Sequence, residues 1–466
     1  VSKLLENIQS EFHLERFNKT KYKSNFKVLL LNLFVTYTVS SKMYLSVPRG
    51  AGDYSASRYN SNNIGYKVFI KIFDALTKLK YIEYHSGHYD SFTATGNRSR
   101  IRVNTKLIKC FKSYSISTAM ITNDKEEETI ILKKSKDESI NPNRKDLVDY
   151  IDNPTTNKMR SNLEEINALL DRTWIDIEIS DKEHTKLNKA LDKKPDKNPI
   201  DFTRRKLRRI FNNSSFEHGG RFYHGWWQEI PSDYRKYITI SGKRVEEEDF
   251  SGIHIRMLYA FEDIEIGSED TYLIEGYGAK YRKQVKVALN TIINAKTKEK
   301  AINSINRELA LPKNKTAKDL FNQLELKHPK IAKYFATGIG IELQYKDSII
   351  AEKVILRLAR DNIVALPVHD SFIVIISHIN DLKEEMNKAY EEVLTTKAIT
   401  DKKESIRKIL EQQEQQRPLV KDQINYKGLR EPITGNELIN ITKEGINNYK
   451  QYNHRENEWR RSRGYP

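Results

Sequence analysis

The chain has 466 residues, which at about 100–200 residues per domain predicts roughly two to four domains. Its 80 Lys and Arg residues outnumber its 63 Asp and Glu residues, giving a formal net charge of +17 and a sequence pI near 9.4. Charged residues make up 31% of the chain and hydrophobic ones only 38%, which predicts a soluble protein and favours a polyanionic partner. Nucleic acid and an acidic membrane face are both such partners, and a basic protein with neither stays an alternative.

A single cysteine, Cys110, excludes an intrachain disulfide and a Cys-clustered zinc or iron–sulfur site. The longest apolar stretch, 28–39, contains Asn32 and two threonines and is shorter than a membrane span. The first residues lack the apolar core of a signal peptide, and they also lack Met, so we expect that the chain was trimmed. We therefore predict an intracellular protein without a membrane partner, in the cytoplasm of a bacterial or phage-infected cell.

Residues 1–115 have the pattern of a winged-helix-like domain. Apolar residues recur at helical spacing from Phe69 to Leu79, and the chain then becomes extended at 81–85. Two turns containing glycine precede a basic strand at 98–103. Helix, strand, loop and strand in this order resemble a winged-helix module, in which a helix can enter a DNA groove while the wing contacts phosphate.

Three arginines alternate along that basic strand. Alternate residues of a strand point to the same face, so Arg98, Arg100 and Arg102 could lie along a nucleic-acid backbone. The alternative is a winged helix used for packing or for contacts with protein.

Two polar segments divide the rest of the chain. Residues 133–145 have almost no apolar content, and residues 192–199 carry two prolines among alternating charges, so both are typical of linkers. An amphipathic helix is predicted around 163–170, between them. The predicted division is 1–115 for the winged-helix-like domain, 116–215 for a linker and helical thumb-like region, 216–400 for the catalytic domain and 401–466 for a charged C-terminal extension.

Two aspartates are placed unlike ordinary surface acids. A strand–turn–strand pattern ends at Asp249, directly before an apolar helix at 253–261. Asp370 follows His369 at the turn of a predicted hairpin spanning 363–376. If these strands pair, the two carboxylates converge at one edge of a sheet, as a two-magnesium phosphoryl-transfer site requires. Either aspartate alone would more often be a cap or turn residue.

A cationic helix is predicted at 281–295, between the two aspartates. Its polar face contains residues four apart, which line one side of the helix: Arg282, Lys286, Asn290 and Asn294. Guanidinium and ammonium groups beside metal-binding acids suit a nucleoside triphosphate. The alternative is a solvated helix face.

The same residues resemble the motifs of family A DNA polymerases. Their motif A is Asp-Tyr-Ser-Gln-Ile-Glu-Leu-Arg, and this chain has Asp249-Phe-Ser-Gly-Ile-His-Ile-Arg256. Arg282-x-x-x-Lys286 is similar to the start of motif B, and Val368-His-Asp370 to motif C. The next two residues, Ser371-Phe372, are closer to the phage-type single-subunit RNA polymerases.

Two upstream segments extend the resemblance. Gly220-Arg221-Phe222 and Gln228-Glu-Ile-Pro231 resemble the Thr-Gly-Arg and Gln-Asn-Ile-Pro segments that precede motif A in the DNA enzymes. The blocks together cover about 216–376, and nothing comparable reaches the N-terminal region.

The resemblance implies an α+β fold with a right-hand polymerase palm and reduced fingers. It implies that Asp249, Asp370 and the carbonyl of Phe250 bind two Mg²⁺ ions, with Mn²⁺ as a substitute. Arg282 and Lys286 would hold the triphosphate, with Lys286 as a general acid for the leaving pyrophosphate.

Further roles come from the same resemblance. Arg221 and Gln228 would lie along the primer–template minor groove, and His369 near the primer terminus. His254, Asn290 and Asn294 would line the nucleotide site.

Three features depart from the family pattern. The Tyr-Gly that closes motif B falls at Asn294-Ala295, so its aromatic ring is missing. The motif A Glu that excludes ribonucleotides is His254, which could accept a 2′-hydroxyl or reject it. The short span between motifs A and B suggests the reduced fingers, and no acidic cluster indicates a proofreading exonuclease.

We therefore predict a template-directed nucleotidyltransferase that uses DNA template and nucleoside triphosphates, with weak sugar discrimination and a preference for ribonucleotides, as in primer synthesis. A primer-extending DNA polymerase of a plasmid, phage or mobile element is the second hypothesis. A DNA-binding replication or regulatory protein that has lost catalysis is the third. A triad of Ser371, His369 and Asp370 is rejected, because sequence neighbours rarely converge in that way.

Overall fold

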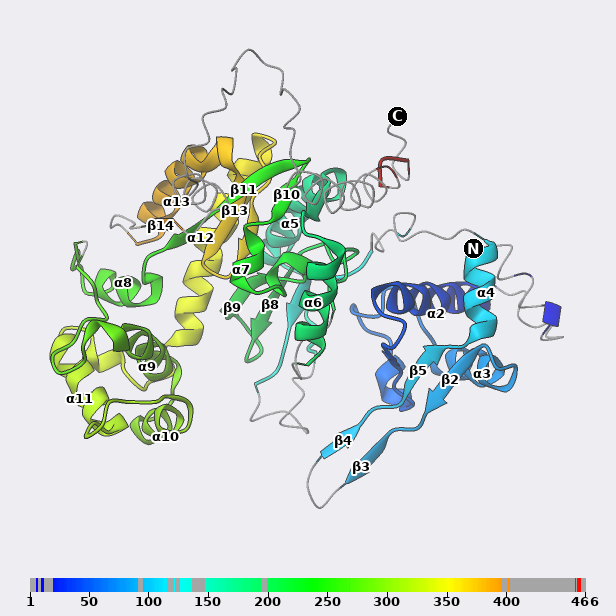
Figure 1. Ribbon diagram of the computed structural model, residues 1–466, viewed down its shortest axis with the longest axis horizontal. Helices are drawn as coiled ribbons and strands as arrows, with labels where there is room; N and C mark the ends of the chain where they lie inside the picture. The colour runs from blue at the N-terminus through cyan, green and yellow to red at the C-terminus, as the bar shows by residue number, and fades with distance from the viewer. Residues whose placement is uncertain are drawn as a thin grey trace, which may run out of the picture.

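The computed structural model describes residues 20–90, 95–114, 126–135, 147–193, 199–267, 269–394, 400–402 and 459–461, with a few isolated positions besides. These residues form a mixed α+β fold, as predicted, with two hydrophobic cores (Figure 1). No helix among them is both long enough and apolar enough to cross a bilayer.

The first core belongs to an N-terminal unit spanning residues 20–114. Its antiparallel sheet has the order β1 (Leu45–Ser46), β5 (Arg100–Val103) and β2 (Ile82–His85), and the hairpin β3 (His88–Asp90)–β4 (Thr95–Asn97) projects beyond it (Figure 1). The helical elements of the unit are α2 (Thr20–Val39), η2 (Ala51–Tyr54), α3 (Tyr66–Lys78) and α4 (Thr105–Ser113). The predicted stripe of α3 is buried from Phe69 to Leu76, and the predicted order of helix, strand, loop and strand is present, with the hairpin β3–β4 in the loop.

The second core extends over a curled antiparallel sheet with the order β12 (Leu366–Val368), β13 (Ser371–Ile375), β11 (Lys243–Phe250), β10 (Ile238–Ile240) and β7 (Ile175–Ile177). β14 (Thr400–Lys402) pairs with the end of β11. A smaller sheet joins β6 (Ile130–Leu132) in parallel to β8 (Arg208–Asn212), and β8 in antiparallel fashion to β9 (Ser215–Tyr223). One core cluster runs from Ile130 to Leu394, so the predicted division at 215/216 passes through shared sheets and a shared core.

Helices surround this sheet and form a group beyond one end of it (Figure 1). Those near the sheets are α5 (Pro154–Arg172), α6 (Asp181–Asp192), α7 (Ser232–Arg235), α12 (Gly340–Arg360) and α13 (Ile379–Leu394), with the short η4 (Trp226–Gln228) and η7 (Ile376–His378). The helical group contains α8 (Ile253–Ala260), η5 (Ala279–Tyr281), α9 (Arg282–Asn294), α10 (Lys298–Glu308), α11 (Ala317–Lys327) and η6 (Ala332–Tyr334). α12 reaches from this group to the sheet, and it packs against β9, α13 and α5.

Local sequence explains the elements that position the site. Ser241 and Gly242 both adopt left-handed φ angles, 51° and 72°, which is the backbone that a two-residue hairpin needs between β10 and β11. α5 begins with a capping box in which Asn153 and Thr156 bond each other's backbone N–H groups, and Pro154 occupies the first helical position. The strand pair that ends at Asp249, the apolar helix at 253–261 and the hairpin at 363–376 are all present, so these predictions are confirmed.

Several predicted segments fall outside the described residues. These are most of the linker at 133–145, residues 194–198 of the second linker and nearly all of the C-terminal extension. Trp459, in the predicted C-terminal extension, is buried against Trp174, with ring centroids 5.6 Å apart.

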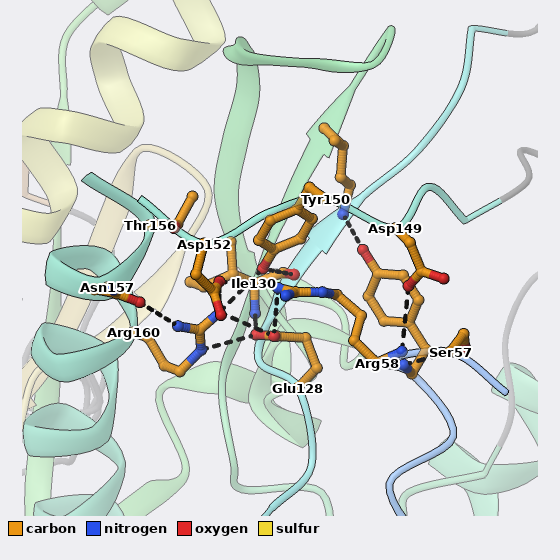
Figure 2. Close-up of polar contacts among 12 residues, drawn as sticks. Ser57, Arg58, Glu128, Ile130, Asp149, Tyr150, Asp152, Thr156, Asn157 and Arg160 are labelled. Carbon is orange, nitrogen blue, oxygen red and sulfur yellow. Dashed lines mark hydrogen bonds and ion pairs between the residues drawn. The ribbon is translucent and has the colours of Figure 1, made fainter. Parts of the chain in front are cut away.

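Arg58, in the loop between η2 and α3, joins the N-terminal unit to the second core (Figure 2). Its guanidinium carbon lies 3.5 Å from the ring centroid of Tyr150, and Nη1 bonds Glu128 at 3.0 Å and Asp152 at 3.2 Å. Arg160 on α5 bonds the same two carboxylates, at 3.0 and 2.8 Å. The side chain of Glu128 is only 6% exposed, so its charge depends on these two cations.

Tyr59 adds a second link beside Arg58. Its hydroxyl accepts a hydrogen bond from the backbone N–H of Leu132 on β6 at 3.0 Å and donates to the carbonyl of Val148 at 2.9 Å. The N-terminal unit is therefore fixed to the edge of the smaller sheet by both charge and backbone contacts.

We expect Arg58→Ala to weaken this junction, because it leaves buried Glu128 with one cation instead of two. Amide exchange at Leu132 should become faster by about tenfold or more, corresponding to roughly 1.4 kcal/mol. Arg307→Ala is the control, since that side chain is 75% exposed on α10. Unchanged exchange in β6 of the Arg58 variant would contradict the role of this junction.

Candidate active site

The two predicted aspartates are neighbours on adjacent strands. Asp249 lies near the end of β11 and pairs in register with Ser371, the residue that follows Asp370. Asp370 occupies the two-residue turn between β12 and β13, and its carbonyl accepts the backbone N–H of Phe250 at 3.3 Å. His369, the other turn residue, has a left-handed φ of 58°. The predicted convergence of these two strands is confirmed.

A third carboxylate, Glu247, shares a face of β11 with Asp249 because the two are two residues apart. The hydroxyl of Ser371 donates to Glu247 at 2.6 Å, and Arg235 donates to both Glu247 oxygens at 2.8 and 3.1 Å. These bonds fix the turn that carries Asp370. Sequence reasoning missed Glu247 and Arg235, although four consecutive acids at 246–249 in one strand were a signal, since such a run places acids on both faces.

Arg221 and His254 both contact Asp347, a buried residue of α12 that sequence reasoning also missed. Arg221 Nε lies 3.0 Å from each carboxylate oxygen, and its Nη2 contacts Oδ2. His254 Nε2 lies 2.9 Å from Asp347 Oδ2 and 3.2 Å from Arg221 Nη2. The predicted groove residue and the predicted sugar residue are thus held by one carboxylate.

This cluster lies within electrostatic range of His369, the residue before Asp370. Desolvation lowers the pKa of the His369 imidazole, the positive charge of Arg221 lowers it further, and Asp370 and Asp347 act in the opposite direction. Its ring also lies 6.4 Å from that of Tyr223 on β9. The lowered pKa favours the neutral imidazole, and Arg221, Asp347 and Asp370 all lie within electrostatic range of it.

Gln228 is bonded to backbone. Its amide nitrogen donates to the carbonyls of Phe222 at 2.9 Å and Pro367 at 3.0 Å, and its amide oxygen accepts from Gly225 at 3.1 Å. The side chain therefore ties β9 and η4 to β12, and this structure gives it a positioning role for the hairpin that carries Asp370.

On the cationic helix α9, the stripe from Val285 to Ile293 is buried as predicted, and Arg282, Lys286, Asn290 and Asn294 are exposed. Arg282 forms an ion pair with Asp270. Asn294 lies against the start of α12, where a Cβ at Gly340 would come within 2.2 Å of its Oδ1. Its amide nitrogen donates to the carbonyl of Asn290 at 2.8 Å.

Tyr272 lies against the cationic face of α9 and close to Gly252, three residues after Asp249. Its ring centroid is 5.3 Å from the guanidinium of Arg282 and 5.7 Å from Lys286 Nζ, and its hydroxyl would lie 3.1 Å from a Cβ at Gly252. Desolvation raises the pKa of Tyr272; Arg282 lowers it and Asp370 raises it. An aromatic ring therefore stands beside the cationic face, although the predicted motif B position has none.

The three arginines of the N-terminal unit lie apart from this site. Arg98 is exposed, Arg100 is half-buried, and Arg102 bonds Glu83 on the adjacent strand at 2.6 Å. Arg100 and Arg102 also lie 5.6 and 4.7 Å from the ring centroid of Tyr44. Of these three arginines, Arg102 has a carboxylate partner among the described residues, so Arg98 and Arg100 are more available to an external anion.

The aspartate pair suits magnesium. Among the residues that the structure describes, no group of three or more His, Cys, Asp or Glu is arranged to hold a metal ion. Mg²⁺ in phosphoryl-transfer sites is commonly bound by one or two carboxylates, and water and substrate phosphates complete its coordination. Asp249 and Asp370 fit that requirement, with the carbonyl of Phe250 next to them.

Comparison with protein-family models gave no match for this chain, and comparison with curated proteins gave none either. The site therefore has to be argued from its own geometry.

A buried arginine joins β8 and β9 to α12 next to the Asp347 cluster. Arg209 on β8 is fully buried, with Nη1 2.5 Å from Glu352, Nη2 3.1 Å from the Ser348 hydroxyl, and Nε 2.9 Å from the Gly220 carbonyl. Gly220 has a φ of +79°, and it directly precedes Arg221. α12 is thus bonded to β8 and β9 next to the Asp347 cluster.

We expect Gly220→Ala to destabilise the protein by about 2 kcal/mol or more. The new Cβ would lie 2.6 Å from Phe211 Cε1 and 2.8 Å from Ser348 Oγ, at a backbone angle that favours glycine. Gly267→Ala is the matched control, because a Cβ there meets nothing within 4 Å. Denaturant unfolding measures both, and equal stabilities would contradict the close contact between β9 and α12.

Proposed function

We propose that this protein is a template-directed nucleotidyltransferase that joins nucleotides by two-metal phosphoryl transfer, with a preference for ribonucleotides as in primer synthesis. The observation that carries the proposal is the placement of Asp249 and Asp370 at the ends of paired strands, together with Tyr272, which lies both against the cationic face of α9 and close to Gly252, three residues after Asp249. The order of the polymerase-like motifs along the chain supports it. In this proposal the curled sheet serves as the palm, and α9 to α11 serve as reduced fingers.

The chain's own groups have distinct tasks in the proposed reaction. Asp249, Asp370 and the Phe250 carbonyl would hold Mg²⁺ or Mn²⁺, which when bound neutralises charge on the transferring phosphoryl group. Lys286, exposed on α9, would contact the triphosphate and donate a proton to the leaving pyrophosphate. Arg282 would exchange its contact with Asp270 for a phosphate.

The N-terminal unit would bind the DNA template. Its helix–strand–hairpin order is that of winged-helix modules, and Arg98 and Arg100 stand near the base of its hairpin. The junction at Arg58 would hold the bound DNA at a set position relative to the aspartate pair (Figure 2).

A DNA-binding protein without catalysis is the second candidate. One observation favours it: Asp347 pairs with Arg221 and Asp270 with Arg282, so two cations that the proposal gives to nucleic acid and triphosphate have partners within the chain. A primer-extending DNA polymerase differs from the leading proposal only in the sugar that it uses. Labelled ribonucleotides and deoxyribonucleotides on primed and unprimed DNA with Mg²⁺ separate all three.

We expect Asp249→Asn and Asp370→Asn each to reduce nucleotide incorporation by about a thousandfold or more, because each removes a charged metal ligand while keeping the side-chain shape. Incorporation of labelled nucleotide on primed DNA measures the effect. Asp361→Asn, at the exposed end of α12, is the control and should keep native activity. Substantial synthesis by either site variant would end the two-metal assignment.

We expect the double variant Arg98→Gln/Arg100→Gln, in the full chain, to weaken DNA binding and to flatten its dependence on salt. Each lost phosphate contact lowers the slope of log K against log salt by about 0.9, so the slope should fall by about 2 if both contacts exist. Arg102→Gln should change the slope less, because Arg102 is bonded to Glu83. Fluorescence anisotropy at several salt concentrations measures this, and an unchanged slope would return the unit to a packing role.

A further inference from the structure

Asp347 holds His254 and Arg221 at one carboxylate, and it lies outside every motif that the sequence resembles. Its side chain is 2% exposed, whereas that of His254 is 14% exposed and remains within reach of a ligand. The pairing has a consequence for the chemistry that His254 offers.

The contact with Asp347 fixes the tautomer of His254. A carboxylate can only accept, and His254 Nε2 lies 2.9 Å from Asp347 Oδ2, so Nε2 must carry a proton. An unprotonated Nε2 would bring two lone pairs together at this distance. Arg221 Nη2 lies 3.2 Å from Nε2, but it is itself a donor and cannot accept the Nε2 proton. It bonds the Asp347 carboxylate instead and balances the negative charge there.

The other ring nitrogen then becomes an acceptor. In the neutral imidazole, a proton on Nε2 leaves the lone pair on Nδ1. His254 Nδ1 makes no hydrogen bond with any residue in the described part of the chain. A lone pair on Nδ1 would select a ligand group that donates, and a ribose 2′-hydroxyl is such a donor, whereas deoxyribose has no hydroxyl at that carbon.

The position of this acceptor connects it to the nucleotide site. His254 lies on the first turn of α8, five residues after Asp249, and its partner Arg221 interacts electrostatically with Asp370. We propose that Asp347 is a positioning residue that sets sugar preference, by holding His254 in the tautomer whose Nδ1 accepts the 2′-hydroxyl of a ribonucleotide. This inference rests on the proposed function, and it adds the residue and the atom that choose the sugar.

The test compares Asp347→Asn with Glu352→Gln. Both replace an α12 acid that pairs with an arginine, but Glu352 pairs with Arg209, whereas Asp347 pairs with Arg221 and His254. Asparagine at 347 can present an NH₂ group to Nε2 and so favour the other tautomer, which turns Nδ1 into a donor.

Two readouts follow for the native protein and both variants. Incorporation of ATP and of dATP opposite template T gives the ratio of kcat/KM for the two sugars, and equilibrium binding of ATP and dATP with Mg²⁺ gives the ratio of their affinities. We expect Asp347→Asn to lower the ribose preference by about tenfold or more in both, and Glu352→Gln to keep it.

A spectroscopic readout guards against a folding effect. In ¹⁵N-histidine-labelled protein, the resonance that disappears in His254→Phe identifies His254, and we expect it to show the Nε2–H tautomer in native protein and not in Asp347→Asn. His254→Phe removes the acceptor without altering Asp347, and it should also lose the ribose preference.

The outcomes separate the two proposals. If native protein incorporates neither nucleotide but binds ATP more tightly than dATP in a manner that depends on Asp347, the proposed function fails and this inference stands. If native protein shows no preference for ATP over dATP in either readout, or if Asp347→Asn keeps the native preference or the native tautomer, the inference is overturned.

Discussion

Two arginine–carboxylate pairs between α12 and β8–β9 carry the arrangement on which the candidate site depends. Arg209 bonds Glu352 from β8, and Arg221 bonds Asp347 from β9, with both acids on one helix. Removing one partner of such a buried pair typically costs about 3–5 kcal/mol, because the remaining charge stays desolvated. Because each guanidinium makes two or three directed bonds, these pairs also restrict how the helix can lie relative to the strand.

That position brings separate parts of the chain to one place. α12 extends from the helical group, where it contacts α9, to the sheet, where it packs against β9 (Figure 1). Tyr272 lies against Lys286 of α9, and Asp347 on α12 contacts His254. The interpretation of this site as a nucleotidyl-transfer site is a proposal that rests on this convergence.

Features that depend on residues close in sequence were mostly predicted, whereas most features that depend on contacts between distant residues were not. The hairpin at Ser241-Gly242, the stripe of α9 and the turn at Asp370 follow from residue spacing and turn chemistry within a few residues, and all three are present. Asp347 has no such signal: it lies 126 residues from Arg221 and 93 from His254, and one Asp on an amphipathic helix resembles any solvated acid.

The predicted domain boundary at 215/216 likewise depended on local composition and missed a contact between distant strands. Residues 192–199 have the composition of a linker, but β7 before them pairs with β10 after them, a contact between strands more than 60 residues apart that composition does not reveal. The role of Arg282 was predicted from its charge on a helix face, and that of Arg221 only from the resemblance to the polymerase segments, whereas their contacts with Asp270 and Asp347 depend on how distant parts of the chain pack.

The most direct test of the account is the location of metal in the protein with nucleotide bound. Crystals grown with MnCl₂ and a non-hydrolysable ATP analogue, measured at the manganese absorption edge, would place the ions by anomalous scattering. The account predicts manganese bound by carboxylate oxygens of both Asp249 and Asp370, at metal–oxygen distances of about 2.0–2.2 Å. A nucleotide bound elsewhere, or manganese at other residues with none at this pair, would contradict it.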